Sequence, residues 1–187
     1  MVANQIRWTV HDLQSMPDDW GWKRYEIING ELFMTRAPHI WHQNAGGNIY
    51  LELSLWSRKT KLGKAFEAPG VVFSEADAVI PDVVWASWQR IENGVDESGH
   101  FVVAPELIVE VLSAGTQNEQ RDRGVKLKLY SLYGVQEYWI ANWRIKTIEV
   151  YRQQSGQLQL VSTLSGPSRL NSPLLEGFDC AVANLFE

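Results

Sequence analysis

Residues 107–112, Leu-Ile-Val-Glu-Val-Leu, are the stretch of this sequence that decides the fold. A near-continuous run of large apolar residues is typical of a strand that is buried on both faces of a sheet. The run contains one charged residue, Glu110. A carboxylate in such a place costs several kcal/mol unless a partner compensates it. The stretch therefore predicts a central strand whose glutamate either belongs to a buried ion pair or has a functional role.

The segment that follows this strand predicts a helix over residues 118–133. Val125, Leu129 and Leu132 recur at helical spacing, so we expect them to form its buried face. Gly134 is well placed to end the helix, because a helix commonly ends at a residue in the left-handed conformation.

On the N-terminal side, the strongest local signal is Asn29-Gly30 between two short apolar stretches, which predicts a tight hairpin. Residues 41–61 predict a long helix and residues 9–13 a short one. Residues 92–99 are polar and contain glycine, so we expect a loop there.

Short runs of branched and aromatic residues predict the remaining strands. They lie at residues 70–73, 78–80, 83–85, 137–140, 147–151 and 158–161. The sum is a mixed α/β fold, with a central mixed β-sheet flanked by helices, an N-terminal hairpin and a C-terminal β extension. A chain of 187 residues suffices for one substantial core, so residues 1–187 are expected to form a single domain.

Composition narrows the class of protein. Hydrophobic residues make up 45% and charged residues 21%, which is ordinary for a globular protein and excludes disordered and fibrous classes. The net charge of -5 argues against a protein that coats nucleic acid by non-specific electrostatics. No apolar run approaches the ~20 residues of a membrane-spanning helix and no apolar leader is present, so we expect a cytoplasmic protein without membrane contact.

Two acids and a lysine form the candidate catalytic set. Asp82 ends the apolar run at residues 78–82, Glu110 lies in the central strand, and Lys126 lies on the predicted helix. Two carboxylates that share a site repel each other unless a cation lies between them. Mg²⁺ suits such a pair, with Mn²⁺ as a substitute, and a bound ion of this kind activates water for phosphodiester hydrolysis. The lysine would neutralise charge that develops on the phosphate.

Other interpretations of these residues remain open. An aspartate after proline commonly begins a turn, and a helix lysine is commonly solvated. Lys128 competes with Lys126, but residues two apart point to different sides of a helix, so at most one should face the site. Trp85 and Trp88 follow the Asp82 strand and either pack in the core or stack on unpaired bases.

Several stretches together resemble the Uma-type putative restriction endonuclease family. They are residues 25–32, His42, Pro81-Asp82-Val83, residues 104–113, the Asp122, Lys126 and Tyr130 set, residues 134–140 and residues 172–178. The resemblance spans nearly the whole chain, and its central block is the most specific part.

This resemblance implies a restriction-endonuclease-like core of the PD-(D/E)XK nuclease superfamily. It implies a Mg²⁺-dependent endonuclease that hydrolyses DNA as a homodimer, with Asp82 and Glu110 as its two metal-binding acids. Leu112 stands where the superfamily pattern has lysine. The family's lysine on the following helix corresponds to Lys126.

Further residues are weaker candidates. Glu26, Glu31 and Glu52 are possible additional acids, although a surface position is the simpler interpretation of each. His42 matches the family pattern and is either a ligand, a substrate contact or a packed side chain. The alternative function is a non-catalytic binding or scaffold protein that retains the nuclease fold, which the acidic balance and Leu112 favour.

Overall fold

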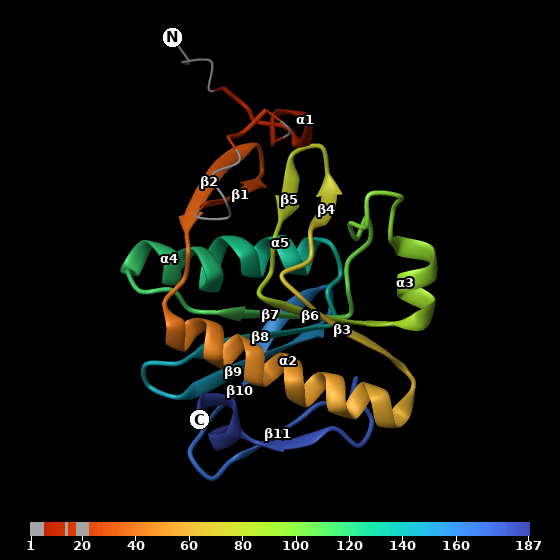
Figure 1. Ribbon diagram of the computed structural model, residues 1–187, viewed down its shortest axis with the longest axis vertical. Coiled ribbons are helices and arrows are strands. Elements are labelled where there is room, and N and C mark those ends of the chain that lie inside the picture. The colour runs from red at the N-terminus through yellow and green to blue at the C-terminus, as the bar shows by residue number, and fades with distance from the viewer. Residues whose placement is uncertain (1–5, 14, 18–22) are drawn as a thin grey trace.

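The computed structural model describes residues 6–13, 15–17 and 23–187, and it confirms the mixed α/β fold (Figure 1). In chain order the elements are α1 (Val10–Leu13), β1 (Lys23–Ile28), β2 (Glu31–Arg36), α2 (Ile40–Thr60), β3 (Gly63–Glu67), β4 (Val71–Ser74), β5 (Asp77–Val79), β6 (Val83–Ser87), α3 (Trp88–Gly94), β7 (Leu107–Val111), α4 (Thr116–Gln120), the π-helical segment η1 (Arg121–Lys126), α5 (Leu127–Leu132), β8 (Glu137–Asn142), β9 (Thr147–Gln154), β10 (Gln157–Ser165), β11 (Arg169–Asn171), β12 (Asp179–Ala181) and the 3-10 helix η2 (Val182–Phe186). Among these described elements, no helix has the length and apolar character needed to cross a membrane.

The central sheet has six strands in the order β10-β9-β8-β7-β6-β3. Strand β7 pairs in parallel with β8 and antiparallel with β6, so the sheet is mixed. All five residues of β7 are buried. Val109 packs into the core on one face, and Ile108 packs into the core on the other. The prediction of a central strand buried on both faces is confirmed.

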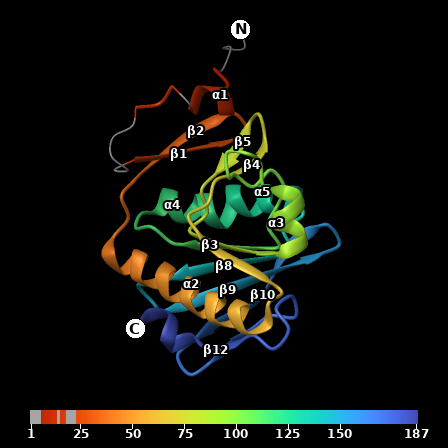
Figure 2. The same cartoon turned by 45° about the vertical axis from the view of Figure 1, so that its right-hand side comes forward.

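Helices cover both faces of this sheet, as predicted (Figures 1 and 2). Ile49 and Leu53 of α2 pack with η2 and the C-terminal segment in one core. Leu129 and Tyr130 of α5 pack in the core on the opposite face. The α4-η1-α5 segment therefore lies against the face that also carries Glu110, because Glu110 alternates with Val109 along the strand.

A second, smaller sheet lies on the side of the α4-η1-α5 segment that faces away from the central sheet (Figure 1). Its strand order is β2-β1-β5-β4, and β1 and β2 form the predicted hairpin. Asn29 and Gly30 both have positive φ, 52° and 75°, which suits the tight turn that this dipeptide favours. The α4-η1-α5 segment is thus enclosed between two sheets.

Two local predictions differ from the structure. The predicted loop at residues 92–99 begins inside α3, whose first turn is capped by the Ser87 side chain accepting from the Arg90 N–H. The predicted inward face of the helix is also partly wrong, because Val125 and Leu132 are 40% and 76% exposed. Apolar spacing could not locate this face, since polar residues of η1 occupy inward positions.

Candidate active site

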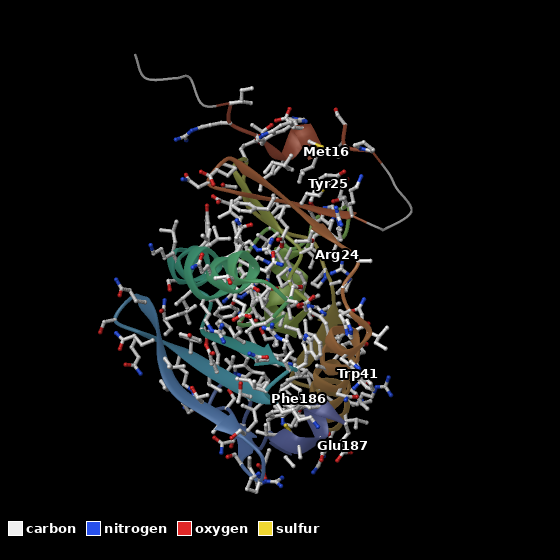
Figure 3. All side chains as sticks on the ribbon, turned by 90° about the vertical axis from the view of Figure 1, so that its left-hand side faces the viewer. Met16, Arg24, Tyr25, Trp41, Phe186 and Glu187 are labelled. Atoms are coloured by element: carbon white, nitrogen blue, oxygen red, sulfur yellow. The ribbon has the colours of Figure 1, made fainter. Side chains whose placement is uncertain are left out.

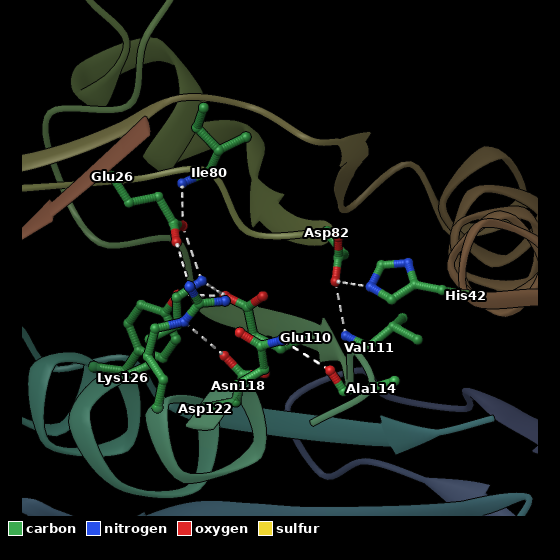
Figure 4. Close-up of polar contacts among 12 residues, drawn as sticks. Glu26, His42, Ile80, Asp82, Glu110, Val111, Ala114, Asn118, Asp122 and Lys126 are labelled. Carbon is green, nitrogen blue, oxygen red and sulfur yellow. Dashed lines mark hydrogen bonds and ion pairs between the residues drawn. The ribbon is translucent and has the colours of Figure 1, made fainter. Parts of the chain in front are cut away.

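The strand register brings the two predicted acids together. Strands β6 and β7 are antiparallel, and Val83 lies opposite Val109. In this register the residue before Val83, Asp82, lies opposite the residue after Val109, Glu110. Residues directly opposite each other on antiparallel strands place their side chains on the same face. The Val111 N–H also donates to Asp82 Oδ2 at 2.8 Å, which fixes the carboxylate beside β7 (Figure 4).

Asp82 is held as an anion. His42 Nε2 lies 3.4 Å from Asp82 Oδ2, and an Arg24 guanidinium nitrogen lies 3.8 Å from Oδ1. Burial raises the pKa of Asp82, but His42 and the Val111 N–H lower it more, so the net pKa is below its usual value. His42, itself buried on α2, is therefore a direct partner of the first acid.

The pKa of Glu110 is raised, whereas that of Asp82 is lowered. Burial raises the pKa of its carboxyl; the Lys126 ammonium opposes this, while Asp82, Asp122 and Glu26 raise the pKa further, to about 8. The strand therefore holds a buried carboxyl group with three acidic neighbours, and Lys126 offsets the effect of burial and of these neighbours only in part. A proton or a cation is needed to balance it.

Lys126 connects Glu110 to the smaller sheet. Its Nζ donates at 2.9 Å both to Glu110 Oε1 and to Glu26 Oε1. Tyr130 OH donates to the same Glu110 oxygen at 2.6 Å, and the Ile80 N–H donates to Glu26 Oε1 at 2.9 Å. Burial lowers the pKa of Lys126, but the surrounding carboxylates raise it above its usual value, so the ammonium group stays charged. The buried ion pair left open for Glu110 exists, and its partner is the candidate catalytic lysine.

The π-helical segment contributes two further charged groups. Arg121 lies 4.0 Å from Glu26 Oε2 and, through Nε, 3.6 Å from Asp122 Oδ1. Asp122 is buried, and within the described residues its Oδ1 has no hydrogen-bond donor. π-helical turns are rare and frequently occur at functional sites. Here η1 faces both Asp122 and Lys126 inward.

These side chains line one small cavity of about 40 Å³ between β1, β7, η1 and the N-terminal part of α2. Its charged and imidazole groups belong to Arg24, Glu26, Arg36, His42, Asp82, Glu110, Arg121, Asp122 and Lys126. The structure thus places Asp82, Glu110 and Lys126 together, with His42 beside them. Glu26, a weaker candidate with a surface position as the simpler interpretation, is buried in the same cavity.

Other sequence candidates lie elsewhere. Glu31 is exposed at the start of β2, and Lys128 is exposed on α5, so only one of the two competing lysines faces the site. Glu52 is half-buried on α2 and acts electrostatically on Cys180 rather than on the acids of the cavity. Trp85 is buried, with its Nε1 donating to Ser57, and belongs to the core.

Sequence reasoning assigned no role to Arg24, it indicated Arg121 only as part of a possible basic strip for DNA, and it placed Asp122 only in the family resemblance. Asp122 lies four residues before Lys126, a spacing that places two side chains on the same helix face, and this signal was available. For Arg24 no local signal exists, because its position depends on how the small sheet packs against the central one.

The donor set fits a hard divalent cation. Among residues 6–13, 15–17 and 23–187, no group of three or more histidines, cysteines and acids has the arrangement of a complete metal cage. Mg²⁺ does not require one, since it is usually bound by one or two carboxylates and completes its shell with water and substrate phosphate. Asp82 and Glu110 are two such carboxylates, and the negative surroundings of Glu110 favour a cation.

The fold matches that of a solved structure. A crystal structure described as a putative nuclease belonging to DUF820, from Anabaena variabilis ATCC 29413, matches with a TM-score of 0.75 and 19% identity, covering 95% of this chain and 97% of that chain. Residues 10–183 match the Uma2 family, described as putative restriction endonuclease. The chain therefore belongs to the Uma2 family, as the sequence resemblance implied. No curated protein matches the chain.

Proposed function

We propose that this protein is a Mg²⁺-dependent endonuclease that hydrolyses phosphodiester bonds in DNA. The observation that carries the proposal is the convergence of Asp82, Glu110 and Lys126 in one cavity from three separate segments, the bend before β6, strand β7 and η1. Membership of the Uma2 family and the nuclease-like fold support the same class of reaction.

The side chains take distinct roles in this proposal. Asp82 and Glu110 would hold Mg²⁺, or Mn²⁺ in its place. When bound, such an ion lowers the pKa of a water molecule and stabilises the leaving oxygen of the phosphodiester. Lys126 holds the Glu110 carboxylate by its 2.9 Å hydrogen bond and supplies positive charge beside the phosphate. Arg24 and Arg121 add positive charge to the wall of the cavity, where phosphate oxygens would lie.

One observation favours the alternative of a non-catalytic scaffold. Lys126 pairs with both Glu110 and Glu26, so the buried acids already have a cationic partner from the chain itself. A scaffold protein would not need a divalent ion at these acids, because a buried ion pair can be purely structural. The two functions therefore differ in whether the acids also bind a divalent ion.

Cleavage and metal binding separate the two functions. The purified protein is expected to cleave DNA with Mg²⁺ or Mn²⁺, and Asp82→Ala and Glu110→Ala are each expected to abolish cleavage. Glu31→Ala is the matched control, because it removes an exposed acid outside the cavity. A calorimetric titration with Mn²⁺ should show binding that Glu110→Ala removes. Cleavage by both acid variants at the parent rate, or no Mn²⁺ binding by the parent, would rule out the proposed site.

We also propose that the protein acts as a homodimer. Cutting both strands of a duplex at one position requires two active sites, and two copies of this chain supply them. Sedimentation equilibrium at micromolar concentration tests this state directly, with a monomer as the contradicting result.

A further inference from the structure

The acidic cavity is too small for a nucleotide, but it opens beside larger hollows. At about 40 Å³ it has room for an ion and water. A neighbouring hollow of about 370 Å³ shares Arg36 and His42 with it. A further hollow of about 430 Å³ contains Trp41 and shares Trp143 with the second. Neighbouring hollows therefore share lining residues along the N-terminal end of α2.

Two aromatic surfaces line these hollows. The His39 ring stacks on Trp143 with 4.8 Å between centroids and 11° between planes. Trp143 Nε1 donates to the Leu112 carbonyl oxygen at 3.1 Å, which fixes the indole next to the end of β7. Trp41 is 53% exposed, and Figure 3 shows it on the same side of the molecule as Arg24 of the acidic cavity. Trp143 itself packs against the core, so the exposed rings are those of Trp41 and His39, and exposed rings accept nucleic-acid bases by stacking.

Positive charge accompanies the aromatic residues. Arg36 lies where the acidic cavity meets the first hollow, and within the described part of the chain it has no carboxylate partner. Arg144 and Lys146 line the second hollow. Arg144 pairs with Glu119, and Glu187 also lines that hollow, so acidic groups offset part of its positive charge, while Arg36 and Lys146 line the hollows without an ion pair among the described residues. We call Arg36, His39, Trp41, Trp143, Arg144 and Lys146 the aromatic groove.

We propose that the aromatic groove binds an unpaired strand of the DNA substrate. Its bases stack on Trp41 and on the His39–Trp143 pair, while Arg36 leads its backbone toward Asp82 and Glu110. A fully paired duplex keeps its bases stacked on one another, so it cannot use these aromatic faces without unpairing. The inference rests on the proposed function and names its substrate class: single-stranded DNA, or duplex DNA with an unpaired segment.

Binding without cleavage tests the groove separately from catalysis. Fluorescence anisotropy in EDTA compares a labelled oligothymidine with a blunt duplex of equal length. The parent is expected to bind the oligothymidine more tightly. Trp41→Ala should weaken that binding about 5- to 100-fold, the usual loss when one stacking aromatic is removed, and should leave duplex binding unchanged. Trp88→Ala is the matched control, because Trp88 is 44% exposed on α3 and lies outside the groove.

The outcomes distinguish this inference from the proposed function. Equal binding of oligothymidine by the parent, Trp41→Ala and Trp88→Ala would overturn the groove, even if the protein cleaves DNA. A loss confined to Trp41→Ala in a protein that cleaves nothing would support the groove and count against the nuclease. Tighter binding of blunt duplex than of oligothymidine, or of oligouridine than of oligothymidine, would overturn the assignment to unpaired DNA.

Discussion

Strands β7 and β8 lie side by side in the central sheet, and each carries a buried glutamate. Glu110 and Glu137 are 4% and 1% exposed. Glu137 Oε1 accepts from Trp139 Nε1 at 2.7 Å, and its Oε2 accepts from the Ser172 hydroxyl at 2.8 Å and from half-exposed Arg152 at 3.4 Å. Both of its oxygens therefore have donors, and among the described residues no other acid shares the set.

Glu110 has donors too, but it also has acidic neighbours. Asp82, Asp122 and Glu26 all act on it electrostatically, and they raise its pKa. The comparison shows that burial of a carboxylate does not by itself mark a functional acid. The two sites also differ in their neighbours, because three acids raise the pKa of Glu110 in addition to its burial, whereas Glu137 has donors to both oxygens.

The largest expected effect is on stability, from removing the cation that Glu110 does have. Lys126→Met leaves Glu110 without its ammonium partner and Glu26 with only Arg121, 4.0 Å away, and should lower the free energy of unfolding by about 3–5 kcal/mol. Urea denaturation measures this. Arg152→Met is the counterpart at Glu137; since Arg152 is half-exposed, its loss should cost about 0–1 kcal/mol. Equal losses of unfolding free energy in Lys126→Met and Arg152→Met would mean that the two glutamate sites do not differ in this respect.

The second effect is on activity. Glu110→Gln should lower the rate of DNA cleavage at least about 100-fold, because an amide is a poor ligand for a hard divalent ion. Glu137→Gln should leave the rate within about threefold, since Glu137 lies outside the cavity. Single-turnover cleavage with saturating Mg²⁺ gives both rates. Comparable losses in the two variants would mean that both act through the fold.

The third effect is on pH dependence in the absence of divalent ions. The folded-state pKa of Glu110 is about 8, above the unfolded value of 4.5, so between these values the folded state binds the proton more strongly. Protonated Glu110 therefore stabilises the folded state. This stabilisation is complete below about pH 4.5 and is lost as pH rises through 8, and the free energy of unfolding falls by at most about 1.4 kcal/mol per pH unit. Thermal unfolding in EDTA should show the fall in the parent and not in Glu110→Gln. Added Mg²⁺ should raise the parent's Tm at pH 8, and an unchanged Tm would contradict the metal site.

The smallest effect concerns Glu137 alone. Glu137→Gln keeps one acceptor oxygen for Trp139 or Ser172 but loses the charge that attracts Arg152. The free energy of unfolding should fall by about 1 kcal/mol, the usual value for one weakened hydrogen bond. Chemical denaturation of the two proteins at one pH is sufficient. A gain in stability would indicate that the Glu137 charge is uncompensated, as that of Glu110 is.

Local sequence signals predicted much of this fold. The apolar run of β7, the Asn29-Gly30 turn and the long helix α2 each depend on residues close together in the chain. Asp82 and Glu110 were identifiable for a related reason, because each lies within or directly beside an apolar strand. Their convergence then followed from the register between β6 and β7.

The rest of the site depends on contacts between distant segments. Glu26 meets Lys126 across 100 residues of sequence, through packing of the small sheet on η1. Nothing near Glu26 in the sequence indicates this contact, and the same holds for Arg24. The inward position of Asp122 was hidden by the apolar spacing of Val125 and Leu132, which predicted a different face.

The wide turn of η1 also bears on how distant relatives are recognised. A π-helical turn accommodates one more residue than an α-helical turn without ending the helix. In this chain η1 ends at Lys126, and the ammonium group reaches the Glu110 carboxylate from 16 positions further along the sequence. A search pattern that demands lysine two positions after the acid rejects this chain at Leu112, although Lys126 Nζ lies 2.9 Å from Glu110.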